Sequence, residues 1–166
     1  MRIENANLDT EEYDILANFP FSSESKRMGI ILRYRKSGKI IFYLKGAETV
    51  MEKKVRPNQR ACLVESCENL AMEGLRTLVI SQKLLTEKDY EEFDQRYKRA
   101  RASLTDREKL VNQAIESIEE DMDFLGVTGV EDKLQEEVMK TIETLRSAGI
   151  QVWMLTGDKI ETAKCI

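Results

Sequence analysis

The segment Thr156 to Lys159, Thr-Gly-Asp-Lys, combines a hydroxyl, a flexible backbone position, a carboxylate and an amine. It follows an apolar run, Ile150 to Leu155, that is typical of a buried strand, and we expect a helix after it. Open α/β sheets bind ligands at such carboxyl ends of strands. The hydroxyl and free amides could donate to phosphate oxygens, and the aspartate could accept from a sugar hydroxyl or lie near a metal. A plain turn followed by a helix cap is the alternative interpretation.

A second group of candidate residues flanks a predicted β-hairpin. Phe21 to Met28, FSSESKRM, enters the hairpin, and Lys45 to Ala47, KGA, leaves it. Strand pairing would bring these ends together and set an aromatic ring beside two or three cations. An adenine stacked on a ring, with its phosphates nearby, needs this arrangement, and base stacking contributes roughly 1 to 3 kcal/mol. The alternative interpretation is a core phenylalanine with surface lysines.

The hairpin is predicted over Met28 to Lys45, where two runs rich in Ile, Leu, Tyr and Phe flank the turn Lys36 to Lys39. Asn58 to Glu73 is predicted to form a helix that Gly74 ends, and Leu75 to Ser81 follows as a strand. The residues expected on one face of this helix are Leu63, Cys67 and Leu70.

Two further helices are predicted after residue 85. Thr86 and Asp89 resemble a capping box, and the helix after them is expected to run to about Ala102. Its aromatic stripe is more typical of a core than of a cofactor site; it consists of Tyr90, Phe93 and Tyr97. A second helical stretch begins at Thr105, and we expect its many Glu and Lys side chains to be solvated. The apolar residues that share its face are Val111, Ile115, Ile118 and Met122.

The last part of the chain has the pattern of a βαβ unit. Phe124 to Val127 is predicted as a buried strand, Lys133 to Ala148 as a helix ended by Gly149, and Ile150 to Leu155 as a second, parallel strand. The helix residues expected to point inward are Leu134, Val138, Ile142 and Leu145. A parallel sheet of two strands does not stand alone, so we expect an incomplete domain here.

Composition excludes several classes of protein. A chain of 166 residues that is 42% hydrophobic and 34% charged is typical of a soluble globular protein, which we expect in the cytosol. No run approaches the roughly 18 to 20 apolar residues of a membrane-spanning helix, and the start does not resemble a secretory signal. The net charge of -4 argues against a nucleic-acid partner.

The cysteine and histidine content limits the possible chemistry. Three cysteines are too few and too unevenly spaced for a disulfide framework, and we expect reduced thiols in or near the core. Because the chain has no histidine, a mixed Cys/His zinc site and a Ser-His-Asp arrangement are both excluded. We predict no metal site and no catalytic residue within this chain.

Five segments occur in the order and spacing in which P-type ATPases carry them. They are PFSSESKRM, YLKGAE, GLRTLV, TGVEDKLQ and WMLTGDKIETA. The chain resembles the type IV, phospholipid-flippase class, and FPFSSESKRMGI is similar to the branch thought to work without an accessory subunit. The resemblance implies an α+β fold, with an antiparallel sheet and flanking helices as the nucleotide-binding (N) domain over residues 1–123, truncated at its start. Residues 124–166 would be an incomplete, haloacid-dehalogenase-like α/β part of the phosphorylation (P) domain.

The resemblance also implies a nucleotide site in the first domain. By similarity to the family, Phe21 would stack on adenine, and Ser23 and Lys26 would line the same pocket. Lys45 would lie deep in the pocket beside the base and ribose, and Arg76 would reach the phosphates.

The resemblance implies a second set of residues, which would bind the phosphate end of the nucleotide. Thr156, Gly157 and Asp158 would receive the γ-phosphate once the two domains close, whereas Asp132 is either structural or part of the domain hinge. Pro20 stands where many relatives carry an acid, which affects a minor adenine contact. The family's phosphorylated aspartate and its later magnesium motif are missing, so we expect truncation at both ends and no activity of this piece alone.

The parent protein implied by the resemblance is a multi-pass pump of a Golgi, endosomal or plasma membrane, with this part facing the cytosol. It would couple ATP hydrolysis, through an aspartyl-phosphate, to phospholipid translocation. ATP and Mg²⁺ would be its cofactors, with the magnesium ligands outside this chain. The expected partners are the phospholipid and the missing membrane, actuator and phosphorylation-domain parts; the piece itself would be monomeric.

Two other classes of function remain open. One is a stand-alone nucleotide-binding or interaction module without a pump. The other, a complete soluble phosphatase of the dehalogenase type, needs a nucleophilic Asp-x-Asp at the end of a first strand, and no Asp-x-Asp stands at the end of a predicted strand.

Overall fold

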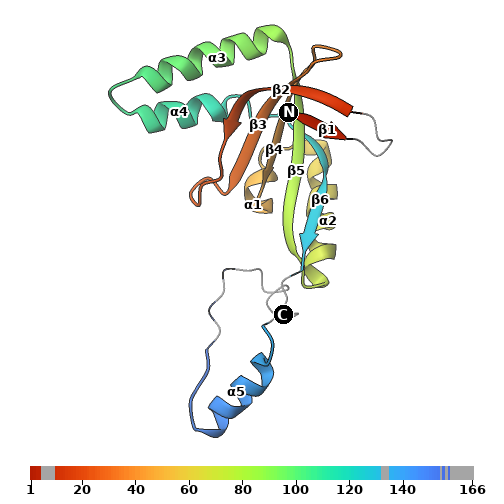
Figure 1. Cartoon of the computed structure of the whole chain (residues 1–166), viewed down its shortest axis with the longest axis vertical. Helices are drawn as coiled ribbons and strands as arrows, with labels where there is room; N and C mark the ends of the chain where they lie inside the picture. Colours follow the sequence, from red (N-terminus) through yellow and green to blue (C-terminus); the bar gives the residue numbers. More distant parts are fainter. Residues whose placement is uncertain (5–9, 132–134, 154, 156, 158–166) are drawn as a thin grey trace.

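The protein is built around one antiparallel sheet of six strands in sequence order, β1 to β6 (Figure 1). The computed structural model describes residues 1–4, 10–131, 135–153, 155 and 157. Each strand pairs with the next along the chain. The strands are β1 (Arg2–Glu4), β2 (Thr10–Phe19), β3 (Arg27–Tyr34), β4 (Ile40–Gly46), β5 (Arg76–Leu85) and β6 (Asp123–Val130).

The described residues also form helices, some of which supply part of the core of the sheet. They are α1 (Glu48–Met51), α2 (Arg60–Met72), α3 (Glu87–Ala102), α4 (Arg107–Glu116) and α5 (Val138–Ser147), with a short 3-10 helix, η1 (Pro57–Gln59), before α2. Side chains from α1, α2 and α3 meet the strands in a single buried cluster. This architecture confirms the predicted α+β class with an antiparallel sheet and flanking helices.

The predicted hairpin is confirmed as β3 and β4. Ile30 lies opposite Tyr43, and Gly38 in the turn has φ +69°, a left-handed conformation that glycine adopts without a steric penalty. Along β4, Phe42 and Leu44 are buried, whereas Tyr43 between them is only partly covered. The sheet therefore has one face in the core and one face that the described helices leave open.

The core face contains the aromatic stripe that the sequence places on α3. Phe93 is buried, and Tyr97 and Tyr90 pack against the cluster. The ring of Phe19 meets Phe93 and Phe42 edge-on, with centroids 5.9 and 6.0 Å apart. The stripe is core, as predicted.

The predicted helix ends are also confirmed. Gly74 follows α2 with φ +79°, and Thr86 and Asp89 form a reciprocal capping box at the start of α3. Hydrogen bonds from the Thr86 hydroxyl and backbone amide hold the pKa of Asp89 below its usual value. The box therefore stabilises the fold above the carboxyl's unfolded-state pKa, and this contribution is lost as pH falls through the lowered folded-state value.

The predicted placement of the thiols in or near the core is met in part. Cys67 is buried in the core, whereas Cys62 is exposed. Cys165 lies outside the described residues.

The strand predicted at Phe124 to Val127 is present, but the burial and the parallel pairing predicted for it are wrong. These residues belong to β6, which pairs antiparallel with β5, so that Val127 lies opposite Val79. A short apolar run fits a parallel or an antiparallel strand equally well, and here the free edge of β5 is the available partner. The division of the chain at residue 124 stays a prediction.

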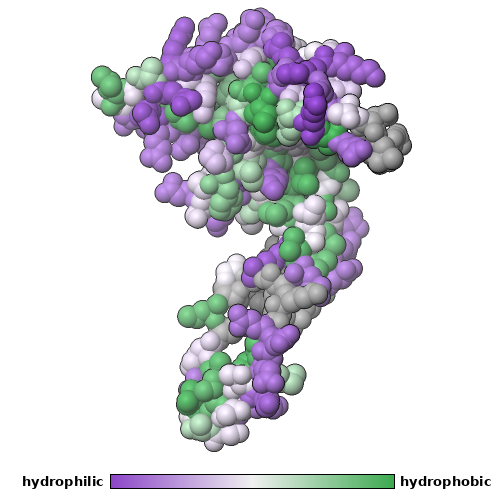
Figure 2. Space-filling model, viewed as in Figure 1, coloured by the Kyte–Doolittle hydropathy of each residue, from purple (hydrophilic) through white to green (hydrophobic). Residues whose placement is uncertain are grey.

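The expectations for the last helix are met only in part. Gly149 ends α5 with φ +79°, as predicted, but α5 begins at Val138 rather than Lys133. No described residue of α5 is buried, Ile142 is 36% exposed, and Figure 2 shows hydrophobic side chains at the surface of this part. The inward packing predicted for its apolar face is therefore absent from the described residues; Leu134 lies outside them.

The second predicted strand, Ile150 to Leu155, is not formed in the part of it that the structure describes. Residues 150–153 and 155 pair with no strand, and Met154 lies outside the described residues. Among the helices described, none has both the length and the apolar character that crossing a bilayer requires.

Candidate functional site

A hollow of about 260 Å³ lies on the open face of the sheet. It forms because alternate residues of four neighbouring strands point away from the core. Five of the side chains around it are apolar or uncharged, and Lys45 is the one charged residue among the described residues that line it. The side chains on this face are Asn18, Met28, Ile30, Tyr43, Lys45 and Ile80.

The strand register fixes the place of Lys45. On β4 it lies between Met28 of β3 and Ile80 of β5, and its side chain is exposed. An apolar floor beside one amine suits a flat, partly polar ring system with an anionic extension, because the ring can be desolvated while the amine offers charge-assisted hydrogen bonds.

The connection between β2 and β3 carries three of the predicted site residues, and Asn18 and Met28, near its two ends, line this hollow. Phe21 is 60% exposed, whereas Phe19, two residues earlier, is buried. The interpretation of Phe21 as a core residue is therefore wrong, and its ring is available for stacking. Ser23 and Lys26 are exposed in the same connection.

Backbone hydrogen bonds join this connection to the end of β4. The amide of Ala47 donates to the Lys26 carbonyl oxygen at 3.0 Å, and the Lys26 amide donates to the Ser22 carbonyl oxygen at 2.9 Å. The hairpin thus brings Lys26 and the segment Lys45 to Ala47 together, as the sequence predicts. Lys26 itself has φ +50°, which a residue with a side chain adopts only where its surroundings hold it there.

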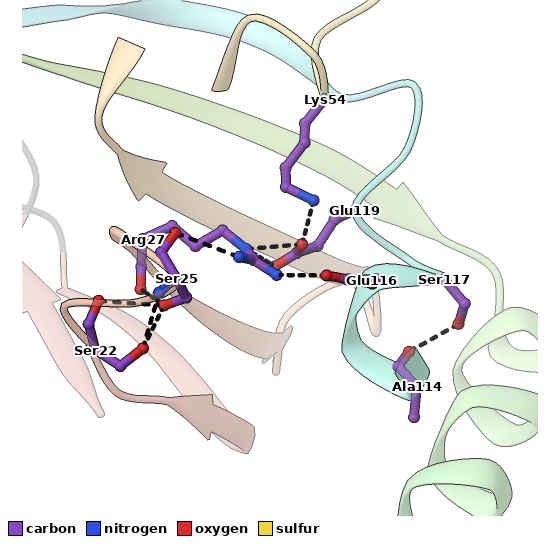
Figure 3. A network of polar contacts seen from close by, with 8 residues as sticks. All are labelled: Ser22, Ser25, Arg27, Lys54, Ala114, Glu116, Ser117 and Glu119. Carbon is purple, nitrogen blue, oxygen red and sulfur yellow. Dashed lines mark hydrogen bonds and ion pairs between the residues drawn. The ribbon is translucent and has the colours of Figure 1, made fainter. Parts of the chain in front are cut away.

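Two serines close the turn within the connection. The Ser25 amide donates to the Ser22 hydroxyl at 3.1 Å, and the two hydroxyls are 2.8 Å apart (Figure 3). Because these hydroxyls hold the turn, Ser23 between them is the serine that stays directed to solvent.

Arg76 lies farther along the same sheet. It begins β5 opposite Val130 and is exposed. Ile80 is four positions later in β5, so the two share a face and stand about 13 Å apart along the strand. This spacing suits a ligand whose base occupies the hollow and whose phosphates extend along β5.

The structure does not place the second set of predicted residues. Thr156, Asp158 and Asp132 lie outside the described residues. Gly157 is described and exposed, and no described heavy atom would contact a Cβ built on it.

A larger groove, of about 430 Å³, lies between the β2–β3 connection and α4. Its lining carries four carboxylates against one cation, Arg27, and this negative balance would repel an anionic ligand. The carboxylates belong to Glu24, Glu108, Glu116 and Glu119. The smaller hollow with its lysine is therefore the better candidate for a nucleotide.

One arrangement near the site was missed by the sequence analysis. Glu119 was expected to be solvated with the other charges of its stretch, but its side chain is only 1% exposed. It forms ion pairs with Arg27 and Lys54 (Figure 3). The sequence does contain an indication of this arrangement. Because side chains alternate along a strand, Arg27 lies on the same face as the core residue Ile31, and a buried arginine requires a partner of opposite charge.

Among the described residues, no group of three or more acidic or cysteine side chains could hold a metal ion.

Comparison with known proteins gives a consistent family. The family model described as P-type ATPase, cytoplasmic domain N, matches residues 1–137. The chain is 54% identical over 154 residues to "Probable phospholipid-transporting ATPase IIB" of Danio rerio, covering 93% of this chain and 14% of that protein. It is 51% identical over 158 residues to "Phospholipid-transporting ATPase NEO1" of Saccharomyces cerevisiae, covering 95% and 14%.

A more distant relative shows the same pattern. "Phospholipid-transporting ATPase 11C" of Mus musculus is 39% identical over 164 residues, covering 99% of this chain and 14% of that protein. The chain thus spans about one seventh of the length of these relatives.

Proposed function

The chain belongs to the P-type ATPases, in which it matches cytoplasmic domain N, and from this membership we propose that it holds the adenosine part of ATP on the open face of its sheet. The observation that carries the proposal is the hollow beside Lys45, whose lining includes Asn18 and Met28, near the two ends of the connection that carries the exposed Phe21 and Lys26. An aromatic ring, an apolar floor and two amines are the elements that a purine nucleotide requires.

The proposed roles follow from these positions. Phe21 stacks on the adenine, and Lys45 donates to the base or ribose from the floor of the hollow. Ser23 and Lys26 border the same ligand, and Arg76 meets the phosphates farther along β5. In the complete protein Thr156, Gly157 and Asp158 receive the γ-phosphate when the neighbouring domain closes on the nucleotide.

For the whole protein we propose the activity named for its relatives, phospholipid transport driven by ATP. Binding of ATP to this domain presents the γ-phosphate to an aspartate elsewhere in the pump, and Mg²⁺ is held by ligands outside this chain. The chain alone lacks that aspartate and is inactive. The domain faces the cytosol, and the pump resides in a membrane.

Isothermal titration calorimetry of the folded chain with ATP tests the proposal. We expect a dissociation constant of about 0.1 to 5 mM, because a millimolar constant corresponds to about -4 kcal/mol and only one side of the site is present. Omitting Mg²⁺ and replacing Thr156 by alanine should each leave the constant nearly unchanged. A folded sample that gives no ATP-dependent signal at about 10 mM, ten times a millimolar constant, would remove the proposal.

A further inference from the structure

The β2–β3 connection carries three of the proposed nucleotide contacts, yet most of it is exposed. Its last residue, Lys26, holds a left-handed backbone conformation. An exposed segment of this kind keeps one conformation only when specific contacts hold it. Without such contacts, the segment would have to become ordered when a ligand binds, and this cost would weaken the affinity. Besides the serine and backbone hydrogen bonds described above, the connection is held by contacts with the next residue, Arg27.

The side chain of Arg27 leaves the sheet on the core face, opposite to the hollow. It is 13% exposed, and its Nε lies 2.8 Å from each carboxylate oxygen of Glu119. Its Nη1 reaches back to the Ser25 carbonyl oxygen at 3.3 Å, inside the connection (Figure 3). One guanidinium therefore joins the connection to a carboxylate fixed in the core.

Lys54 is the second cation of this cluster and comes from a different segment of the chain. Its amine pairs with the second oxygen of Glu119, and its side chain is 16% exposed. Arg27 and Lys54 thus share one buried carboxylate, but only Arg27 adjoins the proposed site. Glu116 is a weak additional partner, at 3.7 Å from Arg27 and with a side chain 58% exposed.

The backbone of Gly46, at the end of β4, packs closely against the last residue of the connection, Lys26. A Cβ on Gly46 would lie 2.8 Å from both the Lys26 carbonyl oxygen and the Arg27 Cβ. The absence of a side chain at Gly46, next to Lys45, therefore lets the end of β4 pack closely against the start of β3. The Arg27–Glu119 pair then fixes the orientation of the β2–β3 connection at this position.

We infer that Arg27 is a positioning residue of the nucleotide site, which holds Phe21, Ser23 and Lys26 over the hollow through its bond to Glu119 rather than by touching the nucleotide. The inference rests on the proposed function. It implies that the free chain is preorganised, so that binding ATP does not have to order the connection.

The test compares Arg27→Gln with Lys54→Gln. Each variant leaves Glu119 with one cation, so both disturb the same buried cluster, but only Arg27→Gln releases the connection. We expect Arg27→Gln to weaken ATP binding roughly 3- to 10-fold, the cost of ordering one or two side chains, and Lys54→Gln to change it less than about twofold. Calorimetric titration of both variants and of the unsubstituted chain gives the constants.

A second measurement reports on the connection without ATP. Heteronuclear NOEs of the backbone amides of residues 22–26 should fall in Arg27→Gln and stay unchanged in Lys54→Gln, whereas a general loosening of the fold would lower both. Should Arg27→Gln fail to fold, Arg27→Lys replaces it, since the amine keeps an ion pair with Glu119 but cannot also reach the Ser25 carbonyl oxygen. Its NOEs should fall and its affinity should weaken in the same direction.

The outcomes separate the two claims. If the unsubstituted chain binds ATP and the two glutamine variants weaken it equally, or neither does, the positioning role is wrong while the proposed function stands. If the unsubstituted chain does not bind ATP, the proposed function fails and the positioning role fails with it.

Discussion

Replacing Lys45 by alanine should weaken ATP binding by roughly 1 to 3 kcal/mol, because a charged hydrogen bond in a partly desolvated hollow is lost. Lys45 is the charged residue of the described lining, whereas Lys26, the other amine of the proposed site, is outside that lining. Phe21→Ala should lose a similar amount, since base stacking on an aromatic ring contributes roughly 1 to 3 kcal/mol. Calorimetric titration of each variant measures both effects.

Two controls separate these effects from loss of structure. Lys39 is exposed immediately before β4, at the end remote from Lys45, so Lys39→Ala should leave ATP binding unchanged. Phe21→Trp keeps a ring and should retain most of the affinity. Equal losses in Lys39→Ala and Lys45→Ala would mean that general charge, rather than the hollow, attracts the nucleotide.

The largest effect on stability is expected for Glu119→Ala. Removing this carboxylate leaves Arg27 and Lys54, 13% and 16% exposed, without their shared partner. Breaking a buried pair in this way costs about 3 kcal/mol or more of unfolding free energy. Urea denaturation followed by circular dichroism should show the lowered midpoint with an unchanged slope.

Glu116→Ala is the matched control for this substitution. Its carboxylate lies three residues away and is largely exposed, so its loss should cost less than about 1 kcal/mol. If the two variants lose the same stability, the buried ion cluster is not what distinguishes Glu119.

The parts of the fold that local signals determine were predictable from the sequence. The glycine turn between two apolar runs predicts β3 and β4, and the capping box predicts the start of α3. The pairing of β3 with β4 then brings Lys26 and Lys45 together, because register follows from the turn.

Features that depend on distant partners were not predictable. The direction of β6 is decided by the edge of β5, more than 40 residues earlier in the chain, rather than by its own apolar run. β2 contains three carboxylates within Thr10 to Asp14 and gives no clear strand pattern. The hollow is formed by side chains that are as far apart in the sequence as Asn18 and Ile80. The buried ion cluster joins Glu119 to cations from two other segments. Neither feature can be recognised in a single sequence motif.

The central claim, that the open sheet face of this chain holds ATP, is tested most directly by mapping amide chemical shifts by NMR during an ATP titration. We predict that shifts concentrate at Met28, Lys45 and Ile80 and in residues 21–26, while α2 on the core face stays unchanged. Saturation should occur with the millimolar constant found by calorimetry. Shifts confined to the acidic groove beside α4, around Glu108 and Asn112, or no shifts on the open face at saturating ATP, would contradict the account.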